Sequence, residues 1–319
     1  MSVALDVIQL QKHFPISGGM LHAVDGVSLS ISRGESVGLV GESGCGKSTL
    51  VRLVARLIDA TNGQIVCGGK DIGSILAKQF GSTPDRARIQ VVFQDPTDSL
   101  NPHFRVSQSI LDPLTRLRRD LTRAERQARV RDIAAQCGLP DALLERYPHQ
   151  LSGGQKARVG IARALATEPE ILILDEPTSA LDVSVQAVIL HLLEDLQKRL
   201  GVSYLFVSHD LNVVRLLCDR VAVMYLGKIV EYAPTEQLFR KPRHPYTRAL
   251  LEAIPGRTGS SERLDGEPQS PVDPDPNTCR FCGRCPREEA LCATKAPVLA
   301  SQGPAHRAAC HFPLGGEGS

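Results

Sequence analysis

Short hydrophobic runs alternate with amphipathic stretches along the first 254 residues of the chain. The short runs are strand-sized and rich in β-branched residues, whereas the longer stretches repeat their hydrophobic positions every three or four residues. This alternation predicts an α/β domain built around a mostly parallel sheet core, at residues 1–254. We expect the clearest strands at residues 36–41, 89–93, 170–175 and 203–208.

A helical subdomain is predicted at about residues 100–168, between the second and third of these strands. Leu121, Ala124 and Ala128 have the spacing of one helix face. Seven arginines lie between positions 116 and 131, but acidic residues are interleaved with them and no aromatic residue is present. A solvated helix face is therefore favoured over a nucleic-acid surface.

The C-terminal region has a different composition. Residues 255–278 contain five prolines among Gly, Ser and acidic residues, which predicts a linker. Residues 279–313 hold five of the nine cysteines, namely Cys279, Cys282, Cys285, Cys292 and Cys310. So small a segment with little hydrophobic content indicates that a metal stabilises it. We expect a small cysteine-rich C-terminal appendage.

Composition and charge describe an ordinary globular protein. Hydrophobic residues make up 42% and charged residues 23%, and the formal net charge of +2 gives no reason to expect nonspecific nucleic-acid binding. The N-terminus lacks the form of a secretory signal, and runs such as residues 171–174 fall far short of the roughly 18 needed to span a bilayer. We expect a cytosolic chain whose membrane association is peripheral.

The sequence GESGCGKST follows the first predicted strand and opens a helix, which is the setting of a phosphate-binding P-loop. Glycines let backbone N–H groups approach phosphate oxygens, and the helix N-terminus favours anions. Lys47 is expected to neutralise the β and γ phosphates, and Ser48 to bind Mg²⁺. Proximity to the helix should lower the thiol pKa of Cys45. The loop comprises Gly41, Glu42, Ser43, Gly44, Cys45, Gly46, Lys47, Ser48 and Thr49.

Two acidic residues end the strand at 170–175, where α/β sheets bind ligands. Asp175 is expected to help hold Mg²⁺, and Glu176 to orient or deprotonate the water that attacks the γ-phosphate. Elsewhere, Ser152 and Gln155 form a capping box that opens another helix, with Gly153 and Gly154 leaving its N-terminus uncovered. One chain has no evident way to aim both helix N-termini at one triphosphate, which indicates that the second serves another subunit.

Together these motifs resemble the ATP-binding subunit of ABC transporters, a family of P-loop NTPases, over residues 1 to about 250. The resemblance implies ATP and Mg²⁺ as ligands and ATP hydrolysis as the activity. It makes Glu176 the catalytic carboxylate, Gln94 a Q-loop residue that reaches Mg²⁺, and His209 the switch residue at the γ-phosphate. It also implies a signature at residues 151–155, a D-loop ending at Asp182, and an adenine-stacking aromatic for which Phe14 is the candidate.

A narrower resemblance comes from residues 93–102, 179–187 and 244–251 together with the cysteine segment. These are similar to the ATPases of dipeptide and oligopeptide importers, whose relatives also carry nickel, glutathione and opines, and most similar to the second of two such subunits. The sequence QKAR after the signature glycines departs from the usual pattern, outside the phosphate contacts.

The narrower resemblance also implies partners and a location. The partners are two membrane permease subunits, an extracytoplasmic solute-binding protein, and a second ATPase subunit or copy in a head-to-tail dimer. The location is the cytoplasmic face of the bacterial inner membrane. An ABC-type ATPase acting on nucleic acid in repair or translation is the alternative, disfavoured by the single nucleotide domain and the lack of a coiled-coil insertion. A noncatalytic subunit is disfavoured by Glu176 and His209.

Three interpretations of the cysteines are open: free thiols, a four-thiolate zinc site and an iron–sulfur cluster. The run CRFCGRCP resembles part of a ferredoxin sequence, which favours the cluster, although the fourth cysteine of that run is missing. The resemblance to peptide importers implies a 4Fe-4S cluster on Cys279, Cys285, Cys292 and Cys310, with Cys282 as a surplus thiol.

Overall fold

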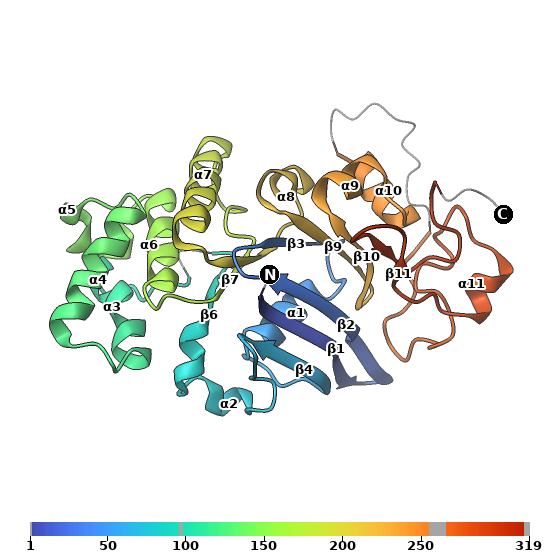
Figure 1. The fold of residues 1–319 in the computed structure, drawn as a ribbon, viewed down its shortest axis with the longest axis horizontal. Helices are drawn as coiled ribbons and strands as arrows, with labels where there is room; N and C mark the ends of the chain where they lie inside the picture. The colour runs from blue at the N-terminus through green and yellow to red at the C-terminus, as the bar shows by residue number, and fades with distance from the viewer. Residues whose placement is uncertain (1, 96–97, 255–265, 316–319) are drawn as a thin grey trace.

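The computed structural model describes residues 2–95, 98–254 and 266–315, and Figure 1 shows their arrangement. Its centre is an eight-stranded sheet in the order β11-β12-β10-β9-β3-β8-β7-β6. Strands β6, β7, β8, β3 and β9 are parallel, and β10, β12 and β11 continue the sheet in antiparallel fashion. The strands are β3 (Ser36–Val40), β6 (Ile89–Val92), β7 (Ile171–Asp175), β8 (Ser203–Val207), β9 (Arg220–Tyr225), β10 (Lys228–Pro234), β11 (Ala300–Ser301) and β12 (Arg307–Ala308).

The four strands predicted from hydrophobic runs correspond to β3, β6, β7 and β8, so that prediction is confirmed. All residues of β3, β6 and β8 are buried, as expected for parallel strands covered on both faces. Helices α7 to α10 lie on one side of this sheet in Figure 1. They are α7 (Val183–Leu200), α8 (Leu211–Leu217), α9 (Thr235–Arg240) and α10 (Pro245–Glu252).

A second, four-stranded antiparallel sheet in the order β2-β1-β4-β5 was not predicted. Its strands are β1 (Val3–Ile16), β2 (Gly19–Ser32), β4 (Asn62–Cys67) and β5 (Lys70–Asp71). Helix α1 (Lys47–Val54) joins the two sheets, because its Leu50 and Leu53 share one hydrophobic core with Leu5 of β1 and Leu39 of β3. Short helices α2 (Ala77–Phe80) and η1 (Pro84–Arg88) follow this sheet along the chain.

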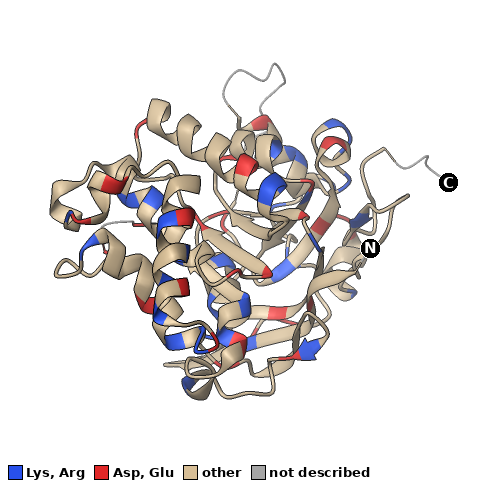
Figure 2. Ribbon diagram, turned by 60° about the vertical axis from the view of Figure 1, so that its left-hand side comes forward, with Lys and Arg blue, Asp and Glu red and all other residues tan. Residues whose placement is uncertain are grey.

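The helical subdomain forms the left-hand end of the molecule in Figure 1. It contains α3 (Val106–Leu117), α4 (Arg123–Gln136), α5 (Asp141–Leu144), η2 (Pro148–Gln150) and α6 (Gly153–Leu165), as the sequence pattern predicts. Arg116 pairs with Asp112 at 3.0 Å and Arg129 with Asp132 at 3.3 Å. Figure 2 shows blue and red residues interleaved along the helices, which supports a solvated, charge-balanced face.

The cysteine-rich segment is docked on the main sheet. Strand β12 pairs with β10 and so extends the main sheet, while α11 (Ala290–Thr294) lies at the end of the molecule opposite the helical subdomain. Glu231 of β10, fully buried, accepts hydrogen bonds from the backbone N–H groups of Arg243 (2.7 Å) and His244 (2.9 Å). Its carboxylate also lies 2.7 Å from Nε2 of His306 in the segment. Buried polar contacts of this kind anchor the segment.

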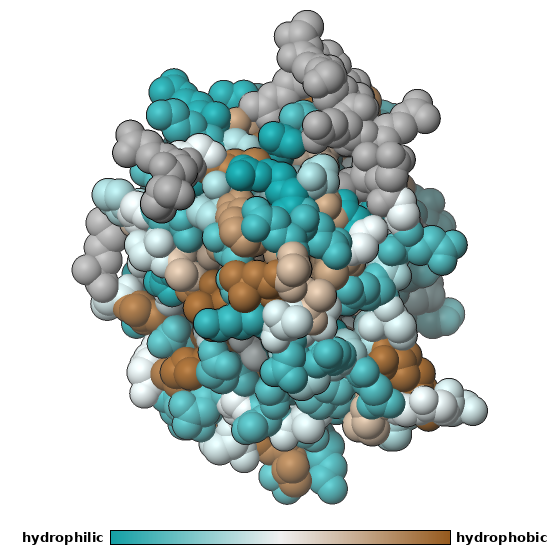
Figure 3. Space-filling view, turned by 90° about the vertical axis from the view of Figure 1, so that its right-hand side faces the viewer, coloured by the Kyte–Doolittle hydropathy of each residue, from teal (hydrophilic) through white to brown (hydrophobic). Residues whose placement is uncertain are grey.

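Part of the predicted linker is also docked on the domain. The carbonyl of Pro271 accepts a hydrogen bond from N–H of His22 at 2.9 Å, and N–H of Asp273 donates to the carbonyl of Met20 at 2.9 Å. Residues 255–265 of the predicted linker lie outside the described residues. Figure 3 views the end that carries the segment, where hydrophilic residues surround small hydrophobic patches. Among the helices of the described residues, none has the length and hydrophobicity needed to cross a membrane.

Candidate functional site

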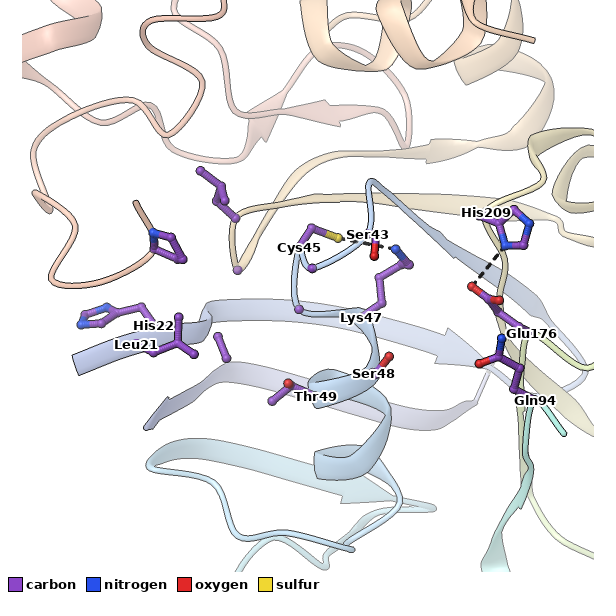
Figure 4. Close-up of a pocket in the computed structure, with 16 residues that line it drawn as sticks. Leu21, His22, Ser43, Cys45, Lys47, Ser48, Thr49, Gln94, Glu176 and His209 are labelled. Atoms are coloured by element: carbon purple, nitrogen blue, oxygen red, sulfur yellow. Dashed lines mark hydrogen bonds and ion pairs between the residues drawn. The ribbon is translucent and has the colours of Figure 1, made fainter. Parts of the chain in front are cut away.

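A cavity of about 550 Å³ gathers residues from four predicted motifs at the carboxyl ends of the parallel strands (Figure 4). Lys47 projects from the start of α1, and Glu176, His209 and Gln94 lie together on one side of the cavity. The predicted site residues that line it are Ser43, Gly44, Cys45, Gly46, Lys47, Ser48, Thr49, Gln94, Glu176 and His209.

Hydrogen bonds between side chains and its backbone hold the phosphate loop in a defined shape. The Lys47 side chain is buried, and its Nζ donates hydrogen bonds to the carbonyls of Gly41 (2.7 Å) and Glu42 (2.9 Å). Gly46 is the N-cap of α1 with φ of 110°, a conformation that favours glycine. N–H of Glu42 donates to the Tyr246 hydroxyl at 2.8 Å. The loop therefore points the uncovered end of α1 and a lysine toward the cavity.

The predicted low pKa of Cys45 is wrong. Its side chain is 4% exposed, and this burial raises the pKa of the thiol, although Lys47 opposes the shift. The sulfur lies 3.8 Å from Lys47 Nζ, so the cation is present but does not compensate for desolvation. The sequence showed the nearby helix N-terminus but not the packing around the thiol.

The acidic residues after β7 have different surroundings. Burial, and then the charge of Glu176, raise the pKa of Asp175. Glu176 reaches the cavity, where its Oε1 lies 3.2 Å from Nδ1 of His209, and its backbone has a φ of 47°. A positive φ is costly for a residue with a Cβ and is commonly held at functional sites by the surrounding structure. N–H of Glu176 donates to the carbonyl of Val207 at 3.0 Å, which helps hold this backbone.

Phe14 does not line the cavity. It lies on β1 opposite Leu21 of β2, and Lys12 Nζ is 5.0 Å from its ring centre. Its stacking role stays a prediction. The cavity is lined instead by residues that the sequence analysis did not single out, because they are distributed over β2, the β9–β10 turn and the C-terminal region without a common motif. These residues are Leu21, His22, Ala23, Leu226, Gly227 and Pro271.

The signature residues lie apart from the cavity lining. Ser152 Oγ accepts the Gln155 N–H at 3.3 Å and Gln155 Oε1 accepts the Ser152 N–H at 3.0 Å, which confirms the predicted capping box. Ser152 and Gly153 are exposed, and Gly154 is half-buried. Asp182, the N-cap of α7, is exposed as well. This chain therefore presents a second helix N-terminus on its surface.

Four cysteines of the C-terminal segment lie near one another. Burial raises the pKa of Cys279, Cys285 and Cys310. The pKa of each of these three thiols is raised further by Cys292 and by one other thiol of the three. The Cys279 N–H donates to the Cys292 carbonyl at 2.8 Å. Burial and a hydrogen bond to Glu288 raise the pKa of Cys282, and Cys279 and Cys292 raise it further, so this thiol lies near the same set. It differs in that it donates its hydrogen bond to Glu288 Oε1 at 2.8 Å.

Comparisons with known proteins agree with this site and define a family. Residues 24–179 match the ABC transporter family, and residues 230–292 match the oligopeptide/dipeptide transporter C-terminal region. The chain belongs to the ABC transporter family, as an ATP-binding protein. A putative peptide import ATP-binding protein of Brucella ovis is 47% identical over 310 residues, covering 96% of each chain.

Further relatives extend the likeness over nearly the whole length. The oligopeptide transport ATP-binding protein AppF of Bacillus subtilis is 44% identical over 97% of each chain. OppF of Salmonella typhimurium is 44% identical over 93% of this chain and 92% of its own. A dimeric ATP-binding cassette solved with ADP and phosphate has a TM-score of 0.65 and 29% identity, covering 72% of this chain and 98% of the cassette.

Proposed function

We propose that the chain is the ATP-hydrolysing subunit of an importer for oligopeptides or dipeptides. The observation that carries the proposal is the cavity that brings the P-loop lysine together with Glu176, His209 and Gln94. A related solute such as nickel, glutathione or an opine is compatible with this site, because solute choice in such importers lies mostly in other subunits. The match of residues 230–292 to the oligopeptide/dipeptide C-terminal region favours peptide over the nucleic-acid alternative.

In the proposed reaction, the loop N–H groups and Lys47 bind and orient the triphosphate, and Glu176 accepts a proton from the attacking water or orients it. His209, whose Nδ1 lies 3.2 Å from Glu176 Oε1, positions that carboxylate and contacts the γ-phosphate. The half-buried carboxyl of Asp175, at the end of β7, fits a cation-binding role, because a bound cation would favour its ionised form. Ser48, Gln94 and Asp175 would hold Mg²⁺, which supplies charge neutralisation of the phosphates.

The surface position of the signature helix supports a head-to-tail dimer. Ser152, Gly153, Gly154 and Gln155 would bind the nucleotide of the second ATPase subunit, with Asp182 beside that interface. ATP would then favour the closed dimer, because the closed state alone supplies both sets of contacts. Two permease subunits and an extracytoplasmic solute-binding protein complete the proposed importer, and the chain would act peripherally at the cytoplasmic face of the inner membrane.

The test is ATP turnover by Glu176→Gln in the reconstituted importer. Loss of a positioned base lowers hydrolysis by about 10²- to 10⁴-fold, while ATP binding persists and the closed dimer accumulates. Glu194→Gln is the matched control, since half-buried Glu194 pairs with exposed Lys198 on α7 and does not line the cavity. Unchanged turnover in Glu176→Gln would contradict the assignment, and failure of the wild-type importer to take up peptides would contradict the substrate.

We also propose that Cys279, Cys285, Cys292 and Cys310 hold a 4Fe-4S cluster. The ferredoxin-like run CRFCGRCP and the mutual influence of these thiols on their pKa values support the proposal. Each of the four thiolates would bind iron of the cluster. The cluster would stabilise the segment.

Iron and sulfide analysis of anaerobically purified protein tests the ligand set. We expect about four iron and four sulfide per chain. Cys292→Ser should lose the cluster. Cys282→Ser should retain it, because the Cys282 thiol is hydrogen-bonded to Glu288 and is not one of the proposed ligands. If the purified protein is colourless and contains one zinc per chain, the cluster assignment is wrong and a zinc site is supported instead. Loss of iron in both variants would contradict the assignment of Cys282.

A further inference from the structure

The cysteine-rich segment contacts the phosphate loop directly through Arg284. Its Nη1 lies 3.0 Å from Oε2 of Glu42, and its Nη2 lies 3.2 Å from Oε1, so the two planar groups form a bidentate pair. The Arg284 side chain is 8% exposed and that of Glu42 is 34% exposed. Arg284 also donates to the Tyr225 hydroxyl at 3.2 Å. The pair joins residues 242 positions apart in the chain.

Glu42 is held at three points, and two of them act on its backbone. Its carbonyl accepts from Lys47 Nζ at 2.9 Å, and its N–H donates to the Tyr246 hydroxyl at 2.8 Å. Arg284 holds the side chain. Because the Glu42 carbonyl contacts the phosphate-binding lysine, a displacement of Glu42 would be transmitted to Lys47.

Glu42 also places a negative charge in a loop that receives a triphosphate. An unpaired carboxylate there would repel the nucleotide, and water would screen that repulsion only in part, since the Glu42 side chain is 34% exposed. Arg284 neutralises that charge and fixes its position. Arg284 does not line the cavity, so its influence on a bound nucleotide would pass through Glu42.

The neighbouring side chains hold Arg284 in place. Phe281 is 1% exposed and packs edge-on against Tyr225 and Tyr246, with ring centres 5.3 and 5.6 Å apart. Arg280 Nη2 lies 2.6 Å from Asp25 Oδ2. The position of Arg284 thus depends on the docking of the whole cysteine-rich segment.

We propose that Arg284 is a positioning residue of the phosphate loop, through which the docked cysteine-rich segment sets the affinity of the site for MgATP. The inference rests on the proposed function, since it concerns the same nucleotide site. It assigns the segment an effect on ATP binding in addition to any role in stability.

The test is MgATP binding to the full chain by isothermal titration calorimetry. Arg284→Gln should weaken binding about tenfold, since it leaves a part-buried carboxylate unpaired. Arg284→Lys keeps the charge and should remain within about threefold of wild type. The Glu42→Gln/Arg284→Gln double variant should recover most of the lost affinity, because the repelling charge is gone. Exposed Arg287, on the same segment, provides the matched control Arg287→Gln.

The double variant separates an electrostatic effect from a folding defect. If Arg284 only stabilised the segment, removing the Glu42 charge would not restore binding, and that result would overturn the proposal. Wild-type affinity in Arg284→Gln would overturn it as well. If Arg284→Gln does not fold, a tenfold loss in Arg284→Lys would count against a charge-based role. Absence of MgATP binding by the wild-type chain would instead contradict the proposed function.

Discussion

Alanine at Gly46 should destabilise the chain much more than alanine at Gly44, although both glycines lie in the phosphate loop with positive φ. Gly44 has a φ of 78°, and a Cβ added there meets no heavy atom within 4 Å. Gly46 has a φ of 110°, and its added Cβ would lie 2.1 Å from the Ala23 carbonyl oxygen and 2.7 Å from Met224 Cε. The two substitutions therefore differ chiefly in steric contact.

The expected magnitudes follow from these surroundings. A left-handed conformation costs alanine about 1–2 kcal/mol, and the reduced entropy of the unfolded chain offsets about 0.4–1 kcal/mol. Gly44→Ala should therefore lower the free energy of unfolding by about 1 kcal/mol. Gly46→Ala adds an overpacking cost of about 1–3 kcal/mol, because the Ala23 carbonyl belongs to strand β2 and cannot move freely. Its total should be about 2–4 kcal/mol.

Urea unfolding of the two variants and wild type, without added nucleotide, measures this difference. The Gly46→Ala midpoint should fall at a lower urea concentration than that of Gly44→Ala, with similar dependence on denaturant. Equal losses would refute the reasoning, since they would mean that the β2 carbonyl and Met224 do not restrict the loop.

Three further predictions concern buried side chains. Cys45 should react with iodoacetamide at pH 7.5 more slowly than free N-acetylcysteine, because burial raises its thiol pKa, and equal rates by mass spectrometry would contradict this. Burial lowers the pKa of His244 to about 4, below its unfolded value, so stability should fall by about 2–3 kcal/mol between pH 7 and 4.5. The variant His244→Asn can still cap α10, and urea unfolding should show that it loses most of this pH dependence. If its free energy of unfolding changed with pH as in wild type, the buried neutral imidazole would not be the cause. Phe281→Ala should expose the C-terminal segment to trypsin, because it lowers the local stability by about 3–5 kcal/mol. Phe312 is half-buried, so Phe312→Ala should have a smaller effect, and equal cleavage of the two variants would count against Phe281 as the anchor.

The parallel core was predictable because its signals are local. Strands such as β7 are continuous hydrophobic runs, and the loop before α1 is identified by glycine and lysine at a fixed spacing. The antiparallel sheet was missed because β1 and β2 are long, half-buried strands whose pairing has several register shifts. Gln9, for example, has a φ of 47° within β1, which interrupts the alternation that a regular strand would show.

The residues of the candidate site also fall into those that the sequence could predict and those that it could not. Lys47 and Glu176 could be named in advance from the patterns of the elements beside them, and His209 from the resemblance to ABC transporter ATPases. The structure places all three around one cavity. The contribution of His22 and Pro271 to that cavity carries no sequence signal, because it depends on where β2 and the C-terminal region are brought together.

The residue types of the phosphate loop, the buried parallel strands and the grouping of the C-terminal cysteines can all be read from the order of amino acids. Folding of the whole chain is needed to bury Cys45 enough to raise its pKa, to hydrogen-bond the Cys282 thiol to Glu288, and to pair Arg284 with Glu42. Local patterns report backbone preference and the hydrophobic face of an element. Desolvation and ion pairing depend instead on which side chains meet after the whole chain has folded.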